Sequence, residues 1–231
     1  MHQWKNSPEQ KKGTDMEVIV LGDGGHSKVI QDMIRTKMEN RIIAILDDKY
    51  EYAHDEHGMT YAPVAYLNQI ITTDTKVVIA IGNNDTRKQL AKKLAVETEQ
   101  YLTVVHPSAV ISPSATIGYG TVVMPGVYIN ADAIIGNHCI INTGAVIEHD
   151  VQIGDFAHIS PNATLTGNVS VSEGVHIGSG ATIIPQIEIG SWSLIGAGST
   201  VIKHIPNFCT AVGCPTQIVK KQAQENIEVR K

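Results

Sequence analysis

The chain has 231 residues, with 18 Lys and Arg against 23 Asp and Glu, and a formal net charge of −5. This balance, without a basic cluster, gives no reason to expect a nucleic-acid partner. Aromatic residues make up only 5% of the chain while 42% is hydrophobic. Such a composition favours one or two domains with largely aliphatic cores.

Cysteine use and hydropathy bear on the compartment. Cys139, Cys209 and Cys214 follow no metal or disulfide spacing, which suits a reducing cytoplasm. No apolar run is long enough to cross a membrane, and residues 1–15 lack the hydrophobic core of a secretory signal. We expect a cytoplasmic protein in which residues 1–15 are a disordered native extension or an artificial addition to the chain.

Residues 16–104 alternate between strand and helix patterns. Apolar runs at 17–21, 41–46 and 77–81 predict strands, and amphipathic stretches at 28–37 and 87–94 predict helices. This order predicts a small Rossmann-like parallel sheet with its ligand at the carboxyl ends of the strands.

Each predicted strand is followed by residues suited to ligand binding. The first leads into Gly22-Asp23-Gly24-Gly25-His26, where a helix start can hold phosphate. The second ends in Asp47-Asp48 and the third in Asn83-Asn84. An ordinary tight turn is the alternative for the glycines, since the third position of the GxGxxG pattern is Ser27. The segment is too short for a full dinucleotide fold, so we expect a mononucleotide or a nucleotide-sugar.

A strict six-residue repeat fills the second half of the chain. An aliphatic residue occupies every sixth position: Val105, Ile111, Ile117, Val123, Ile129, Ile135, Ile141, Ile147, Ile153, Ile159, Leu165, Val171, Ile177, Ile183, Ile189, Ile195 and Val201. A period of six excludes a helix or coiled coil and is typical of a parallel β-helix. The alternative is a sandwich of short antiparallel strands, whose loops rarely keep one period. We assign this fold to residues 105–219, followed by a polar tail at 220–231.

Glycine and asparagine recur at the expected corners of the coil. Glycine often follows the aliphatic position, at Gly118, Gly136, Gly154, Gly178, Gly190 and Gly196. We expect these glycines, together with Asn130, Asp132, Asn137, Asn142 and Asn162, to relieve turns that need a positive φ.

The best catalytic candidate is His149, which lies between Glu148 and Asp150, with Asn142 and His158 nearby in sequence. Histidine is the natural general base near neutral pH, and a carboxylate can fix its tautomer and raise its basicity. His106, at the domain junction, is left open. Five further histidines are expected to be incidental surface residues: His54, His57, His138, His176 and His204.

Several motifs together resemble the sialic-acid/bacillosamine-type sugar acetyltransferases. They are the strand–GxGGH–helix start, the Asp-Asp after the second strand, the IGNN-x-x-R segment at 81–87, the HPSAVISPSA segment at 106–115 and the N-T-x-x-x-I-E-H-D segment at 142–150. The resemblance covers residue 16 to about 219. It implies a left-handed β-helix, an exception to the right-handed crossover rule, and a homotrimer with active sites between subunits.

The resemblance also implies roles for individual residues. His149 matches the catalytic base, Asp150 supports it, and His158 contacts the thioester carbonyl of acetyl-CoA. The expected substrate-binding residues are Gly22, Gly24, Gly25, His26, Asp47, Asp48, Asn83, Asn84, Arg87 and Asn142. The expected coenzyme A contacts are His158, Gly167, Ser179, Ala197 and Lys203. No metal is expected.

The function predicted from these residues is acetyl transfer from acetyl-CoA to a nucleotide-linked, preferably UDP-linked, amino sugar for glycan biosynthesis. The alternatives are O-acetylation of a sugar hydroxyl, a longer acyl donor on a carrier protein, and a non-catalytic nucleotide-sugar-binding scaffold. A zinc-dependent γ-type carbonic anhydrase shares the coil, but the spacing of His149 and His158 does not suit its zinc site.

Overall fold

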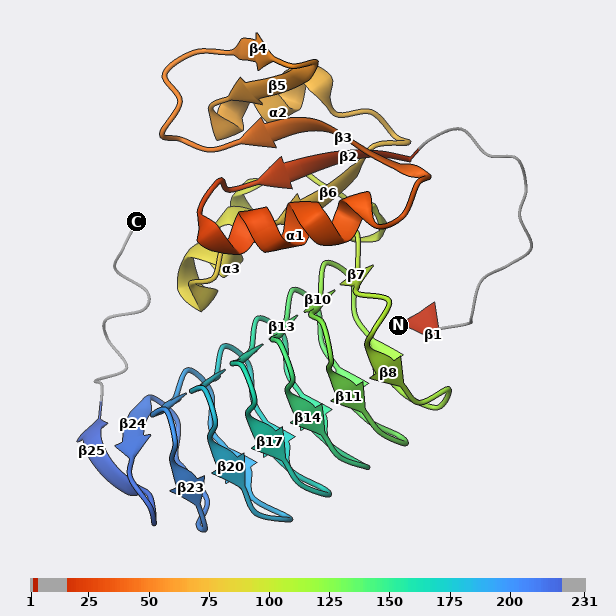
Figure 1. Cartoon of the computed structure of the whole chain (residues 1–231). Helices are drawn as coiled ribbons and strands as arrows, with labels where there is room; N and C mark the ends of the chain where they lie inside the picture. The colour runs from red at the N-terminus through yellow and green to blue at the C-terminus, as the bar shows by residue number, and fades with distance from the viewer. Residues whose placement is uncertain (1, 4–15, 222–231) are drawn as a thin grey trace.

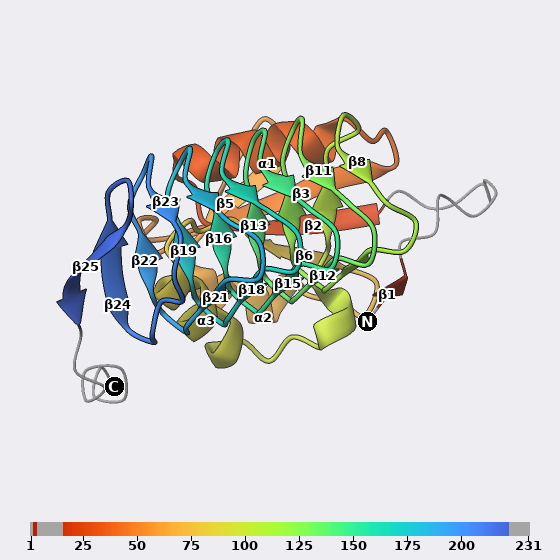
Figure 2. The ribbon, with the colours of Figure 1, turned by 90° about the horizontal axis from the view of Figure 1, so that it is seen from below.

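The computed structural model describes residues 2–3 and 16–221, so the expectation for residues 1–15 falls almost wholly outside the described part. An α/β unit formed by residues 16–101 rests on a long coil of short strands (Figure 1). Seen from below, the coil lies in front of this unit, and helix α1 runs parallel to the long axis of the coil (Figure 2). The two predicted domains are therefore in close contact.

The N-terminal sheet has the order β4-β5-β3-β2-β6. The three predicted strands are β2 (Met16–Leu21), β3 (Asn40–Leu46) and β6 (Lys76–Ile79), all parallel. Two further strands were not predicted: β5 (Met59–Ala62), parallel to β3, and β4 (His54–Glu56), antiparallel at the edge. The chain moves outward from β2 through β3 to β5 and then returns to the other side of β2 for β6. Ligands bind at such a reversal in α/β sheets.

Helices cover both faces of this sheet. Helix α1 (Gly25–Arg35) packs on the face toward the coil, and α2 (Leu67–Ile70) and α3 (Asn84–Lys93) are on the other face. Short 3₁₀ turns lie at Val64–Tyr66 (η1) and Thr98–Gln100 (η2). Residues of β2 alternate between the two cores, because successive strand side chains point to opposite faces. Val18 and Val20 join α1 and the coil in one core, and Ile19 and Leu21 join α2 and α3 in the other.

The coil contains three parallel sheets whose strands pair across 18 residues, as in Val122 with Ile140. The first sheet, which we call the domain-facing sheet, contains β7 (Val104–Val105), β10 (Val122–Val123), β13 (Ile140–Ile141), β16 (His158–Ile159), β19 (His176–Ile177) and β22 (Leu194–Ile195). The second contains β8 (Val110–Ile111), β11 (Tyr128–Ile129), β14 (Val146–Ile147), β17 (Thr164–Leu165), β20 (Thr182–Ile183) and β23 (Thr200–Val201). The third contains β9 (Thr116–Ile117), β12 (Ile134–Ile135), β15 (Gln152–Ile153), β18 (Ser170–Val171) and β21 (Glu188–Ile189).

Each turn of the coil therefore uses three of the six-residue repeats. The aliphatic positions of the repeat point inward and are buried, apart from the half-buried Ile111 in the second sheet. Strand β24 (Cys209–Val212) extends the domain-facing sheet and pairs with the antiparallel β25 (Gln217–Lys221) at the far end. At the near end, β1 (His2–Gln3) pairs with β9.

The corners differ from the expectation in where positive φ falls. It recurs every six residues, beginning at Gly120, and includes Asp132 and Asn162 as predicted. Asn130, Asn137, Asn142 and the glycines that follow the aliphatic position are not among these residues. A different physical reason requires glycine at those positions, since a Cβ on Gly118 would lie 2.5 Å from the carbonyl carbon of Gly136 one turn later. They allow close stacking of the turns.

Candidate active site

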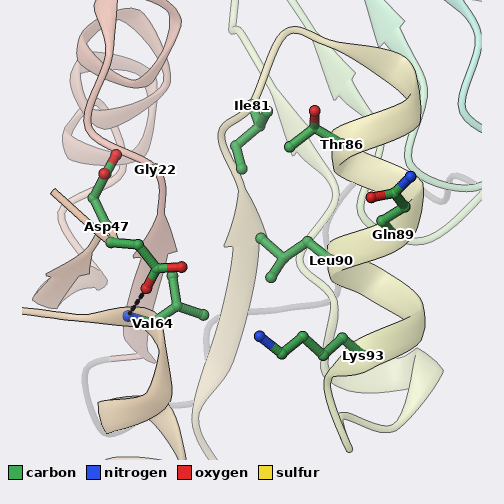
Figure 3. A pocket seen from close by; sticks show the side chains of 9 residues that line it. Gly22, Asp47, Val64, Ile81, Thr86, Gln89, Leu90 and Lys93 are labelled. Carbon is green, nitrogen blue, oxygen red and sulfur yellow. Dashed lines mark hydrogen bonds between the residues drawn. The ribbon is translucent and has the colours of Figure 1, made fainter. Parts of the chain in front are cut away.

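A cavity of about 350 Å³ lies at the carboxyl ends of the N-terminal strands (Figure 3). Three of the predicted substrate residues, Gly22, Asp47 and Asp48, line it. Helix α3 forms the opposite wall, with Leu90 and Lys93 extending toward the cavity (Figure 3). The remaining lining residues are Val64, Ile81, Thr86 and Gln89. The reversal of strand order has therefore produced a cavity where the sequence predicted a nucleotide.

Backbone N–H groups hold the two carboxylates of this cavity in place. Asp47 Oδ2 accepts a hydrogen bond of 2.7 Å from the N–H of Asp23, and Asp48 Oδ1 accepts one of 2.9 Å from the N–H of Val64. Lys49 Nζ and the hydroxyl of Tyr50 both donate to Asp23 Oδ2 at 2.6 Å. Burial raises the pKa of Asp23, but these two hydrogen bonds and the positive charges of Lys49 and Lys28 together outweigh burial and leave the pKa below its usual value.

The glycine-rich turn leads directly into α1. Gly24 is the N-cap residue and supplies no side-chain hydrogen bond to the helix, so Gly25 and His26 open the first turn. The N–H groups of such a turn have no intrahelical acceptor and are suited to an anion.

His26 lies close enough to His158 of the coil to affect its ionisation. Burial lowers the pKa of His158 most, and the charges of His176, Arg87 and His26 act in the same direction. Burial lowers the pKa of His158 to about 3 and that of His26 to about 4. Both rings are therefore neutral at neutral pH.

His158 belongs to a column of polar side chains on the domain-facing sheet. Its ring stacks on that of His176 with 4.7 Å between centroids, and His176 Nε2 lies 2.9 Å from the hydroxyl of Ser160. Asn142 Oδ1 accepts from the N–H of Thr143 at 2.8 Å, which turns the amide nitrogen toward His158 Nε2 at 3.1 Å. His158 Nε2 is therefore the acceptor, and the proton is on Nδ1.

The Nδ1 atom of His158 is buried and has no well-formed hydrogen bond among the described residues. The backbone of Gly82 lies close enough to it to oppose the lowering of its pKa. This atom therefore faces the N-terminal domain.

His149 forms a second, separate centre. It lies at the corner between β14 and β15, with 61% of its side chain exposed, and its Nδ1–H donates to Asp150 Oδ2 at 2.8 Å. This hydrogen bond raises the pKa of His149 above its ordinary value of 6.5, and the charge of Glu148 acts in the same direction. The predicted imidazole–carboxylate pair is present, with Nε2 left to accept a proton.

Gly167 lies one turn beyond His149 and leaves room for its ring. A Cβ at this position would be 2.6 Å from Cε1 and 2.7 Å from Nε2 of His149. Gly167 and Lys203 belong to the same corner as His149 by the 18-residue spacing. The exposed Ser179 and Ala197 belong to the corner that follows the domain-facing sheet. The predicted coenzyme A contacts thus divide between two corners.

A single chain does not unite all the predicted site residues. His26, Asn142 and His158 lie on the side that faces the N-terminal domain, whereas His149 and Asp150 occupy the corner opposite the domain-facing sheet. Within the described residues, no cluster of three or more His, Cys, Asp or Glu could hold a metal ion.

The structure changes the interpretation of three residues of the IGNN-x-x-R segment. Asn83 caps α3, since its Oδ1 accepts from the N–H of Thr86 at 2.9 Å. Asn84 and Arg87 are buried between the two domains and bond to the coil instead of lining the cavity. Their polar groups bond to the coil, to the end of β6 and to each other, so their expected role as direct substrate contacts stays a prediction.

Two histidines expected to be incidental surface residues prove otherwise: one is buried and the other is half-buried in a stack of rings. His138 is 6% exposed, and its ring stacks on Phe156 at 5.0 Å and meets Tyr101 edge-on. His176 stacks on His158. An 18-residue spacing, which puts His176 one turn after His158, is the signal that would have found this column.

Comparison with known proteins gives the same division of the chain. Residues 17–94 match the family model described as PglD N-terminal domain, and residues 114–149, 132–167 and 168–203 match that described as bacterial transferase hexapeptide (six repeats). A UDP-N-acetylbacillosamine N-acetyltransferase from Bacillus subtilis (strain 168) is 50% identical over 106 residues, which make up 45% of this chain and 49% of that protein. The match spans about half the length of this curated relative.

Two solved structures match almost over their whole length. PerB from Caulobacter crescentus, in complex with CoA and GDP-perosamine, is 36% identical with a TM-score of 0.80, covering 88% of this chain and 97% of that one. The chain belongs to the sialic-acid/bacillosamine-type sugar acetyltransferases. The acetyltransferase domain of PglB from Neisseria gonorrhoeae FA1090, in complex with acetyl coenzyme A, is 32% identical with a TM-score of 0.80, covering 89% and 100%.

Membership of this family of sugar acetyltransferases confirms the predicted fold, a Rossmann-like unit followed by a left-handed parallel β-helix of hexapeptide repeats. Among the helices of the described residues, none is long and apolar enough to cross a membrane.

Proposed function

We propose that the protein transfers an acetyl group from acetyl-CoA to the amino group of a nucleotide-linked amino sugar, with His149 as the general base. The observation that carries the proposal is the exposed His149–Asp150 pair, in which Nε2 is free to take a proton. The curated relative and the perosamine enzyme are both N-acetyltransferases, which favours an amine over a hydroxyl acceptor.

The proposed chemistry needs little beyond positioning and proton transfer. The lone pair of the acceptor nitrogen attacks the thioester carbonyl carbon, and His149 Nε2 takes the proton that the nitrogen loses. The tetrahedral intermediate then breaks its C–S bond, and the imidazolium returns the proton to the departing CoA sulfur. General-base help of this kind contributes about 10²–10⁴-fold.

The developing oxyanion needs a hydrogen-bond donor. The sequence left His158 and a backbone N–H as candidates. In the described structure the Nε2 of His158 accepts from Asn142 and its Nδ1 is buried. This arrangement supports a backbone N–H as the donor, with His158 holding Asn142 beside the acceptor sugar and lining the acyl site.

We further propose that a neighbouring copy completes the site in a homotrimer. His149 lies on the opposite side of the coil from His26 and His158, so one chain cannot present all three to one substrate. The outer face of the second sheet, between the His149 corner and the Ser179 corner, exposes apolar side chains at Val110 and Tyr128. Such a face suits contact with another coil, and it would bring the two groups of predicted coenzyme A contacts together from adjacent subunits.

The nucleotide is proposed to occupy the cavity at Gly22, Asp47 and Asp48, with its phosphates at the N–H groups of Gly24 and Gly25. We favour UDP, the carrier named for the curated relative at 50% identity, although the perosamine enzyme binds a GDP-linked sugar. The use of acetyl-CoA and the free cysteines of the chain fit a cytoplasmic location.

The test is incubation of the protein with acetyl-CoA and a panel of UDP- and GDP-linked amino sugars, followed by mass spectrometry of the products. We expect one acetyl group on the amino sugar, and His149→Ala should lower turnover about 10²–10⁴-fold while acetyl-CoA binding remains. Binding of both ligands without product would favour the scaffold function. Acetylation at a hydroxyl would favour O-transfer, and unchanged turnover of His149→Ala would remove the catalytic assignment.

A further inference from the structure

Helix α3 contacts both the proposed nucleotide cavity and the coil. One side of the helix, with Thr86, Gln89 and Leu90, lines the cavity. The other side, with Asn84, Arg87 and Lys88, bonds to a single corner of the coil. The helix therefore connects the proposed binding place of the nucleotide with the part of the molecule that handles the acetyl group.

Arg87 is the centre of this connection. Its side chain is 1% exposed, and all five of its N–H groups donate hydrogen bonds. Nε donates to the carbonyl of His138 at 2.8 Å, and Nη2 donates to that of Phe156 at 2.8 Å, in the next turn of the coil. The second Nη2 hydrogen goes to Asn84 Oδ1 at 3.0 Å.

The remaining hydrogens of Arg87 reach the end of β6. Nη1 donates to the carbonyls of Ile81 at 2.9 Å and Gly82 at 3.3 Å. Ile81 lines the cavity, and the backbone of Gly82 lies beside His158. One planar guanidinium thus fixes the cavity wall, two turns of the coil and a neighbour of His158 relative to one another.

Neighbouring residues extend the same contact along the corner. Asn84 Nδ2 donates to the carbonyls of Gly174 and Val175 at 3.1 and 3.2 Å, one turn beyond Phe156. Lys88 pairs with Glu173 and lies 4.9 Å from the centre of the Trp192 ring. Helix α3 is therefore attached at four consecutive turns.

The cost of burying Arg87 indicates a purpose beyond stability. Its acceptors are all neutral oxygens, and burial lowers its pKa to about 10, so the group stays charged at neutral pH. A well-packed apolar side chain is often as stabilising as a buried charged network. A rigid five-donor fork instead fixes orientation.

We propose that Arg87 is a positioning residue that sets the distance between the nucleotide cavity and the acyl-transfer site, so that a nucleotide-linked amine reaches the thioester. This inference rests on the proposed function. A small misplacement of the acceptor relative to the donor can lower the rate about 10²-fold without weakening either ligand.

The experiment compares wild type and Arg87→Lys, which keeps the charge but loses the fork. We expect kcat for the nucleotide-linked amino sugar to fall about 10–10²-fold, while the Kd values of the free nucleoside diphosphate and of acetyl-CoA stay within about twofold of wild type. The matched control is Lys92→Gln, an exposed residue on the same helix, which should leave all three quantities unchanged.

An unchanged kcat would overturn the inference. A fall in kcat accompanied by an equal weakening of nucleotide or acetyl-CoA binding would also overturn it, because a purely structural role would produce that result. If Arg87→Lys does not fold, Asn84→Ala decides the question. It removes two hydrogen bonds to the coil and one acceptor of Arg87, and should give a smaller fall with the same pattern. Absence of product from wild type on every acceptor would instead remove the proposed function, and the binding measurements would still stand.

Discussion

At the scale of single residues, the proposed chemistry depends on one exposed imidazole. Burial lowers the pKa of three histidines of the coil, to about 3 in His158, to about 4 in His138 and in the same direction in His176. The pKa of His149 is raised instead, because its exposed ring is little desolvated and its Nδ1–H donates a hydrogen bond to the carboxylate of Asp150. A raised pKa makes it a stronger base, and this is the property that proton removal from an amine requires.

Replacing Asp150 should move the pH profile. In Asp150→Asn the carboxylate that raises the pKa of His149 is lost, so this pKa should fall toward 6.5. A general base works only when neutral, so the acidic limb of the kcat/KM profile should move to lower pH, and the rate on the alkaline plateau should decrease. Rates measured from pH 5 to 9 check this, and a limb that stays in place would exclude His149 as the titrating base.

We expect that the sole requirement for glycine at position 167 is the space that it leaves for the ring of His149. Because a Cβ there would lie 2.6 Å from the ring, Gly167→Ala should displace it and reduce kcat about 10–10²-fold. The thermal midpoint should change little, since His149 is exposed. The control is the same substitution in a His149→Ala background, where it should have no further effect on turnover. Additive losses would point to a separate contact with coenzyme A.

At the scale of elements, the coil is a set of ladders with an 18-residue spacing. From Gly120 to Gly198 a residue at positive φ recurs every six positions, and at the corner beneath α3 His138, Phe156 and Trp192 adopt it despite their bulky side chains. His138 stacks on Phe156, Arg87 bonds to the carbonyls of both, and Lys88 contacts the ring of Trp192. These stacked corner residues form the surface against which α3 packs.

The buried histidines of this contact should make the protein acid-sensitive. The pKa of His138 is about 4 in the fold against 6.5 unperturbed. The unfolded chain therefore binds more protons between these values, and stability is lost as the pH falls from 6.5 toward 4, by about 1.4 kcal/mol per pH unit for each such histidine. His138→Phe should reduce this slope in urea unfolding between pH 7 and 4.5. An identical slope would contradict the assignment of a neutral, buried His138.

At the scale of the whole molecule, the two halves of the proposed site lie on opposite sides of one coil. His149 and Asp150 project from the corner away from the N-terminal domain, while His26 and His158 face it. In the proposed homotrimer, the His149 corner of one copy would face the exposed second sheet of the next. The proposed site would then be complete only in the oligomer.

Mixing two inactive variants tests this arrangement. His149→Ala and His26→Ala each remove one half of the proposed site, so each alone should be inactive. If a site takes His149 from one copy and His26 from its neighbour, randomly mixed trimers should regain about a quarter of the sites. Activity after co-expression measures this recovery, with mass determination of the assembly as the control. No recovery in trimers that do form would assign both histidines to one chain.

The sequence alone determined the repeating and local features of this protein. The six-residue period required a β-helix, because only a coil of short strands buries the same position of every repeat. The three central strands and the helices α1 and α3 followed from local patterns. The pairing of His149 with Asp150 also needed the turn of the backbone at which Asp150 adopts a positive φ. Short strands such as the exposed β4 and the half-buried β5 carry too weak a pattern to be predicted.

Only the tertiary structure decided the contacts between the halves. Arg87 and Asn84 could be read as ligand-binding residues from the sequence, and their burial against the coil depends on how α3 meets one corner. The same contact buries His138, and His176 is half-buried on the neighbouring domain-facing sheet, where it stacks on His158. The physical reason is that a periodic pattern fixes which side chains face the coil's interior, whereas the partner of an outward-facing side chain depends on which other element packs over it.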